Sequence, residues 1–211
     1  MDAYKQGMKQ NGEIYIHSKS ESSIRVYCDM LIDGGGWIVL QRRNDNSTSF
    51  YRGWEEYKLG FGSLDGNFWL GLKAMHQLTS RKKAVLRIDL VDKDGKTGFA
   101  KYTDFKIHGP KTQYRLQVGT FSGNVGDSLF YHNGMEFSTA DMDNDAHSSY
   151  NMAVTRGGPW WFGLEYKSNL NNFAYENHTL SYRSMKKMSW FSWSSSYGSI
   201  KFSEMKMRTE N

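Results

Sequence analysis

The feature that most constrains this chain is a change of pattern at Gly119. Before it, apolar and polar residues alternate in runs typical of β-strands. From residue 119 to about residue 196 that periodicity fails, and Gly, Ser, Asn and Asp dominate. A strand pattern returns at residues 199–202, with apolar Met205 and Met207 beyond it. The chain is therefore expected to leave a sheet, build a loop-rich unit and return to the sheet.

Six runs before residue 119 predict strands, separated by turn-forming sequence. Asp94-Gly95, between two of them, is a strong hairpin signal. Alternation with one apolar side indicates an antiparallel sheet with one face toward solvent. The predicted strands are 13–17, 24–28, 37–40, 86–90, 99–107 and 114–118.

Two helices are predicted between the strands. Residues 54–58 form a short helix ended by Gly60 and Gly62. Residues 68–78 place apolar side chains at near-helical spacing, which predicts a longer helix that packs on the core.

Composition excludes several classes of function. The 211 residues include 15% aromatic side chains, which indicates a folded chain. The net charge is +5, but the basic clusters are short and lie among acids, so a nucleic-acid surface is not expected. No apolar run of about 18 residues occurs, and no membrane span is expected. No leader is visible, so a secreted form would carry its leader outside this sequence.

Enzyme signatures are absent from the sequence. It contains no H-E-x-x-H, G-x-S-x-G or P-loop motif, and the six histidines are scattered. Cys28 is the only cysteine, so no internal disulfide forms, which by itself favours a reducing compartment. Glycosylation triplets beginning at Asn46 and Asn177 favour an extracellular location instead.

The segment 138–151 is the strongest candidate for a metal site. Asp141, Asp143 and Asp145 alternate there among small residues, and several carboxylate oxygens suit calcium. An EF-hand counted from Asp141 needs Gly at its sixth position and Glu at its twelfth. The sequence has Ala146 and Met152, so the EF-hand is excluded.

A series of short motifs follows in order along the whole chain: Cys28-Asp-Met30, Gly34-Gly-Gly-Trp37, Gln41-Arg-Arg43, Trp54-Glu-Glu-Tyr57, Phe68-Trp-Leu-Gly71, Tyr131-His-Asn-Gly134, Asp143-Asn-Asp145, Trp160-Trp161 and Ser168-Asn-Leu-Asn171. With these motifs the chain resembles the fibrinogen-like C-terminal domains, closest to the tenascin and ficolin branches. The resemblance implies one α+β domain over residues 1–211, with a central twisted antiparallel sheet, short helices and a calcium lobe. It divides the chain into 1–43, then 44–118 plus 197–211, and 119–196.

The resemblance also implies a bound Ca²⁺. Asp143 and Asp145 match the family's two side-chain ligands, and the backbone carbonyls of His147 and Ser149 would complete the site. A solvated acidic turn without metal is the alternative.

The family's ligand pocket departs from its usual pattern here. Its disulfide would join residues 152 and 165, which are Met152 and Glu165. The acetyl-binding positions of ficolin-like lectins correspond to Glu165-Tyr166 and Ser184-Met185, the candidate ligand residues. Cys28 matches a family cysteine whose partner would precede Ala3.

The resemblance implies a secreted, non-enzymatic recognition module, displayed as an oligomer through an upstream stalk. Its partner is expected to be an extracellular matrix or cell-surface protein, because the acetyl-pocket residues have changed. The alternative is a ficolin-like lectin that binds acetylated or other glycans in innate recognition. Most of the tryptophans in the loop-rich part, Trp160, Trp161, Trp190 and Trp193, are expected to form its core.

Overall fold

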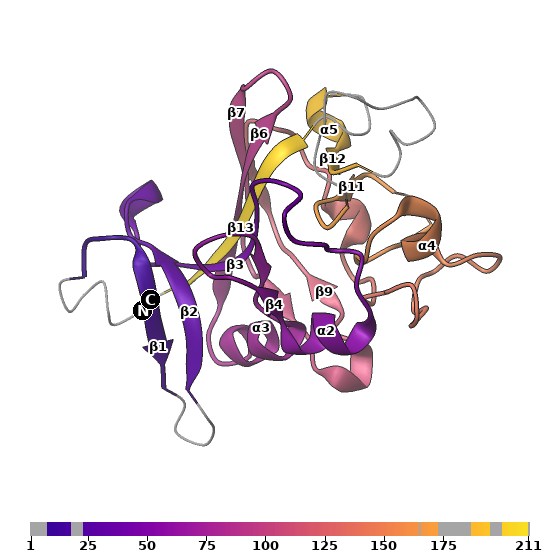
Figure 1. Cartoon of the computed structure of the whole chain (residues 1–211), viewed down its shortest axis with the longest axis horizontal. Helices are drawn as coiled ribbons and strands as arrows, with labels where there is room; N and C mark the ends of the chain where they lie inside the picture. The colour runs from indigo at the N-terminus through magenta and orange to yellow at the C-terminus, as the bar shows by residue number, and fades with distance from the viewer. Residues whose placement is uncertain (1–7, 18–22, 165, 173–186, 195–199, 211) are drawn as a thin grey trace.

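The structure, a computed structural model, describes residues 8–17, 23–164, 166–172, 187–194 and 200–210. A large antiparallel sheet crosses the molecule, with helices on one side and a loop-rich lobe at one end (Figure 1). The strands are β1 (Gly12–Ile16), β2 (Ile24–Asp29), β3 (Trp37–Arg43), β4 (Phe61–Gly62), β5 (Phe68–Trp69), β6 (Ala84–Asp92), β7 (Thr97–Tyr102), β8 (Lys106–Ile107), β9 (Leu116–Gln117), β10 (Phe121–Gly123), β11 (Ser168–Asn169), β12 (Ser189–Trp190) and β13 (Ile200–Thr209). The helices are α2 (Trp54–Leu59), α3 (Leu72–Thr79), α4 (Met152–Arg156) and α5 (Phe191–Ser194), with 3-10 turns η1 (Ile32–Gly34), η2 (Pro110–Thr112) and η3 (Phe130–His132).

The last strand, β13, lies in the middle of the main sheet. The strand order is β1-β2-β3-β13-β6-β7-β10, with β5 on β3 and β4 on β5. β13 pairs antiparallel with β3 on one side and with β6 on the other, and Met205 and Met207 are buried. The prediction that the chain returns to its sheet after a long loop region is therefore confirmed, as is the α+β class.

The predicted helix 68–78 is wrong in its first part. Phe68 and Trp69 form β5, which pairs with Gln41 and its neighbours on β3, and α3 begins only at Leu72. Gly71 separates the two elements with φ +101°, and a Cβ there would lie 2.7 Å from the backbone of Leu59. The prediction failed because the apolar residues keep helical spacing across this turn, whose backbone conformation only glycine adopts without strain.

The predicted strands 99–107 and 114–118 are also shorter than expected. β7 ends at Tyr102, and Asp104 turns the chain with φ +49°. Lys106 and Ile107 then form β8, which pairs with β9 in a separate small sheet. Tyr114 has φ +53° and lies outside β9, although its side chain is buried. The alternation of apolar and polar residues therefore predicted correctly which side chains are buried here, but it did not predict where strand pairing is interrupted.

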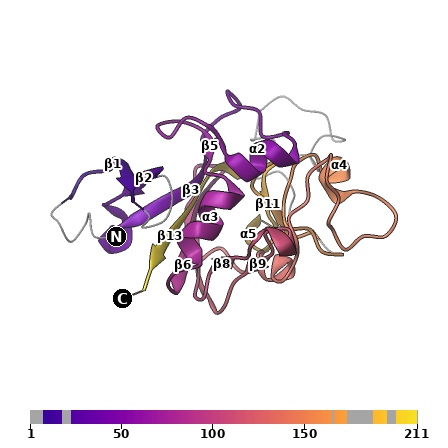
Figure 2. The ribbon, with the colours of Figure 1, turned by 90° about the horizontal axis from the view of Figure 1, so that it is seen from below.

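The loop-rich lobe is attached to the main sheet through backbone groups. Gln41, fully buried on β3, donates from Nε2 to the carbonyl of Leu170 at 2.9 Å and accepts from the hydroxyl of Ser203 at 3.1 Å. The buried Arg43 guanidinium donates to the carbonyl of Asn172 at 2.6 Å. Figure 2 shows the lobe, with α4, beyond one end of the sheet, and the β1–β2 hairpin at the other end. Within the described residues, no helix has the length and apolar character needed to cross a membrane.

Candidate functional site

The aspartate-rich loop is fixed at both ends. At its base, Ser138 and Trp160 exchange backbone hydrogen bonds of 3.0 and 3.2 Å. At its far end, Asn151 caps α4 by accepting the N–H of Val154. The loop projects from the lobe, on the side of the molecule away from β1 and β2 (Figure 1). Its carboxylates are therefore held by defined backbone on either side.

Asp141 serves as a helix anchor. Its carboxylate accepts the backbone N–H of Trp54, at the start of α2, at 2.9 Å and the hydroxyl of Thr139 at 2.6 Å. Partial burial acts to raise the pKa of Asp141, but these hydrogen bonds outweigh it, and the pKa lies below its usual value. A Cβ at Gly53 would lie 2.8 Å from this carboxylate. Asp141 therefore joins the loop to α2.

Asp143 and Asp145 lie together in the same loop. Asp145 N–H donates to Asp143 Oδ1 at 3.3 Å, while the Asp145 carboxylate accepts the N–H groups of His147 and Met152, both at 2.7 Å. Burial raises the pKa of Asp145, and the nearby Asp143 carboxylate raises it further, against the effect of the two N–H groups. The loop thus brings two negative charges together and holds one of them rigidly.

His147 and Ser149, predicted to offer carbonyl groups, follow directly in this loop. Ser149 N–H donates to His147 Nδ1 at 3.3 Å, which leaves the ring proton on Nε2. The ring stacks on Tyr150 with centroids 3.8 Å apart. Across the described ranges, no three His, Cys, Asp or Glu side chains gather as a metal site. A cation here would depend on two carboxylates and on backbone oxygens.

The donor set of this loop fits a hard cation. Asp143 is exposed. Among the described residues, Asp145 Oδ1 accepts the N–H of His147 and Oδ2 that of Met152, so each oxygen has a further lone pair for a cation. A divalent cation between the two carboxylates would also remove the repulsion that raises the pKa of Asp145. Oxygen ligands of this kind are those that calcium prefers.

Of the four candidate ligand residues, the structure describes only Tyr166. Glu165, Ser184 and Met185 lie outside the described residues. The Tyr166 side chain is buried: its hydroxyl hydrogen-bonds to Ser189 Oγ at 2.7 Å, and the Arg156 guanidinium lies 5.2 Å from the ring centre. In this structure Tyr166 packs inside the lobe.

The tryptophans of the lobe form its core, as predicted. Trp160, Trp161 and Trp190 are fully buried, and Trp193 is partly buried against the same core. Trp161 Nε1 donates to the carbonyl of Tyr114 at 2.9 Å, and Trp190 Nε1 donates to that of Gly126 at 3.0 Å. The three fully buried rings are therefore not available to stack on a ligand.

A residue that sequence reasoning did not single out, His132, joins three segments of the lobe. It is fully buried in η3. Nδ1 donates to the carbonyl of Trp161 at 2.7 Å, and Nε2 accepts the N–H of Ser168 at 3.1 Å. These partners require the neutral ring with its proton on Nδ1. Burial lowers the pKa of His132 to about 4. In the sequence, His132 is part of the Tyr131-His-Asn-Gly134 motif that supports the family resemblance, but the motif does not indicate that its side chain joins these segments.

A second feature missed from the sequence is an exposed apolar surface on the lobe, formed by Phe130, Tyr131 and Leu164. Their exposed fractions are 66%, 45% and 72%. Phe130 and Tyr131 contact each other edge to face, and the backbone before Leu164 passes beside Tyr131. The ammonium of Lys167 lies 5.3 Å from the Tyr131 ring centre. Several large exposed apolar side chains together are typical of an interaction site.

Comparison with known proteins identifies the family. Residues 1–210 match the family described as fibrinogen beta and gamma chains, C-terminal globular domain. This chain belongs to that family, and it is a non-enzymatic binding module of the fibrinogen-like class. The predicted resemblance and the absence of enzymatic function are thereby confirmed.

Similar proteins include bovine microfibril-associated glycoprotein 4, 43% identical over 98% of this chain and 83% of its own length. Human tenascin-R is 40% identical over 94% of this chain. The fibrinogen-like globe domain of human ANGPTL2 superposes with a TM-score of 0.93 at 34% identity, covering 100% of this chain and 97% of that one. The chain spans only 14% of the length of human tenascin-R.

Proposed function

We propose that this chain is an extracellular, calcium-stabilised recognition module that binds a matrix or cell-surface protein through its loop-rich lobe. The observation that carries the proposal is the exposed surface of Phe130, Tyr131 and Leu164. Aromatic side chains are enriched at protein interfaces. The surface belongs to the lobe that also carries the aspartate loop.

The relatives support a protein partner. One is named a microfibril-associated glycoprotein. A lamprey fibrin D-dimer, 30% identical with a TM-score of 0.88, is described in complex with the peptide Gly-His-Arg-Pro-amide. The fold is therefore one on which a short peptide has been found bound. In this chain, Met152 and Glu165 stand at the two positions where the family resemblance places the cysteines of a disulfide beside the acetyl pocket.

Calcium is proposed to stabilise the lobe. Asp143 and Asp145 would supply carboxylate oxygens, and the carbonyls of His147 and Ser149 the remaining protein ligands. When bound, the ion supplies positive charge that offsets the repulsion between the two carboxylates. Asp145 also accepts the N–H of Met152, the first residue of α4, so order in the loop extends to that helix.

Asp143→Asn is expected to abolish a calcium-dependent rise in the melting temperature. A ligand that binds only the folded state adds about 2.7 kcal/mol of stability at a hundred times its dissociation constant. The measurement is thermal unfolding of the wild-type chain and the variant, each in millimolar calcium chloride and in chelator.

Asp141→Asn is the matched control in the same loop. Because Asp141 caps α2, this variant should unfold at a lower temperature in both buffers and still gain stability from calcium. Equal melting temperatures with and without calcium for the wild type would contradict the calcium proposal.

The second candidate function is recognition of acetylated or other glycans, as in ficolin-like lectins. The exposed rings of Phe130 and Tyr131 favour it, because apolar sugar faces stack on such rings. A glycan array probed in calcium decides this point. If the chain binds acetylated sugars in the presence of calcium and Tyr131→Ser loses this binding, the ligand is a glycan and not a protein.

Replacing Phe130 and Leu164 together by serine is expected to reduce binding to cell-derived extracellular matrix at least about tenfold. Aromatic anchors at interfaces contribute about 2 kcal/mol or more each, while the exposed side chains add little to folding. The measurement is retention of labelled chain on decellularised matrix, with the melting temperature as a check on folding.

Tyr15→Ser with Leu31→Ser is the matched control. These side chains are 62% and 70% exposed and lie at the N-terminal end of the molecule. The control should bind matrix as the wild type does. Equal loss in both double variants would show that general stickiness, and not this surface, causes retention.

A further inference from the structure

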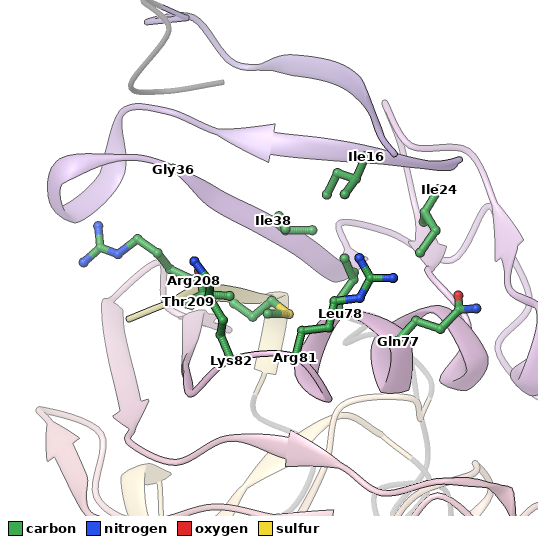
Figure 3. A pocket seen from close by; sticks show the side chains of 11 residues that line it. Ile16, Ile24, Gly36, Ile38, Gln77, Leu78, Arg81, Lys82, Arg208 and Thr209 are labelled. Carbon is green, nitrogen blue, oxygen red and sulfur yellow. The ribbon is translucent and has the colours of Figure 1, made fainter. Parts of the chain in front are cut away.

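A cavity lies between the N-terminal hairpin and α3, at the opposite end of the molecule from the aspartate loop. Its volume is about 180 Å³. Figure 3 shows Ile16, Ile24 and Ile38 on one side and Leu78 with Gln77 on the other. Nothing in the proposed recognition function uses this cavity.

Strand register explains why the cavity wall is apolar. Ile16 pairs with Ile24 across β1 and β2, and Met207 pairs with Ile38 across β13 and β3. Directly paired residues point to the same face of a sheet, so two apolar pairs form one continuous wall. Leu78 closes the opposite side from α3, and it is only half-buried there.

Cations line the rim of the cavity. Arg81 and Lys82, directly after α3, extend their charged ends into the space between α3 and the hairpin (Figure 3). None of the described residues that line the cavity is acidic. The third cation, Arg208, donates from its guanidinium to the carbonyls of Asp33 and Gly35, each at 2.8 Å.

The positive charge continues beyond the rim. A second hollow on the other side of Arg81 and Lys82 is also lined by Lys83 and Lys106. Asp104 is the one carboxylate among the described residues that line this second hollow, and it lies 3.7 Å from the Lys83 ammonium. The described residues that line the two hollows therefore carry more positive than negative charges, and positive charge attracts anions.

We propose that this cavity binds a small amphipathic anion. The ligand has an apolar part the size of one aromatic ring or a short alkyl chain, and it carries a carboxylate or sulfate that contacts Arg81 and Lys82. An engineered apolar cavity of about 150 Å³ in another protein binds benzene, which sets the size of the apolar part. Burial of the apolar part and the ion pair at the rim both contribute to the affinity for this ligand.

The test uses three probes with the same ten-carbon skeleton and different charge: phenylbutyrate, phenylbutanol and phenylbutylamine. Calorimetric titration of the 211-residue chain should show phenylbutyrate binding at least about tenfold more tightly than the alcohol, and the amine binding most weakly. Amide shifts in NMR spectra should map to residues around Ile16, Leu78 and Met207.

Two variants separate the apolar and ionic contributions. Leu78→Trp fills the cavity and should abolish binding of all three probes. Lys82→Glu should weaken phenylbutyrate about tenfold and remove its advantage over the alcohol. Lys73→Glu is the control: it is an exposed lysine on α3 outside the cavity, and the change in net charge is the same.

Three results would overturn the proposal. They are equal affinity for the three probes, no binding of phenylbutyrate, and binding that survives both Leu78→Trp and Lys82→Glu. Sedimentation of the wild type provides a further check. A dimer that dissociates in Leu78→Glu would assign the cavity to a second copy of the chain and not to a small anion.

Discussion

Replacing Lys206 by methionine is expected to lower the free energy of unfolding by about 3–5 kcal/mol. Lys206 is buried on the central strand β13. Its ammonium lies 2.7 Å from Asp29, 2.9 Å from Asp89 and 2.6 Å from Glu204. Methionine fills similar space but carries no charge. Three carboxylates in or near the core would then have lost their shared cation.

The pH dependence of the stability lost in Lys206→Met identifies the cause of that loss. Burial acts to raise the pKa of Asp29, but the hydrogen bond from Lys206 and the N–H groups of Leu31 and Ile32 outweigh burial and lower the pKa. Without Lys206 the pKa of Asp29 rises. Protonation then removes the uncompensated charge, so the deficit relative to wild type should shrink as the pH falls.

Urea unfolding at neutral and mildly acidic pH measures both effects. Lys58→Met is the control, because it removes an exposed pair with Glu55 and should leave the midpoint close to that of the wild type. Asp29→Asn added to Lys206→Met should restore part of the lost stability. If Lys206→Met is no more harmful than Lys58→Met, the buried network does not hold the sheet together.

The sheet was predictable where burial and strand pairing coincide. Leu86, Ile88 and Leu90 alternate in sequence and are all buried on β6. On β13, Met205 and Met207 follow the same rule, but Lys206 between them is buried as well. A pattern of apolar and polar residues expects such a lysine on a solvent face. Its burial depends on acids from β2 and β6 that come together only in the fold.

The residue types of the candidate site were predictable from the sequence, but the arrangement of their side chains was less so. Alternating aspartates indicated one group of three ligands from residues alone, and the family resemblance reduced it to Asp143 and Asp145. The structure supplies a physical reason to separate Asp141, which is the anchor of α2, a helix 87 residues earlier in the chain. Such a long-range bond leaves no local signal in sequence. The exposed surface at Phe130 and Leu164 likewise depends on two segments that fold beside each other.

Lowering the pH from neutral to about 4 is expected to destabilise the lobe by about 3 kcal/mol through His132. Burial lowers the pKa of His132 from 6.5 to about 4, since the folded lobe accommodates only the neutral ring. Between these values the unfolded chain binds a proton that the folded chain does not. Stability is therefore complete above pH 6.5 and is lost progressively as the pH falls toward 4.

His132→Gln isolates this contribution. Glutamine offers one donor and one acceptor and does not titrate, so the variant should be less stable at neutral pH but lose less stability on acidification. Thr79→Val is the control. It removes buried hydrogen bonds to Met75 and Ile107 without removing a titrating group, and should keep the wild-type slope.

Asp141 and Asp145 do not account for a loss of stability between pH 6.5 and pH 4. Asp141, with its lowered pKa, loses its contribution only below the ordinary pKa of 3.8. Asp145 acts in the opposite direction, because its raised pKa lets the folded chain take up a proton first, which adds stability on acidification. Both contributions cancel in the difference between wild type and His132→Gln. Parallel stability curves from pH 7 to pH 4 for these two proteins would therefore show that His132 is not buried in its neutral form.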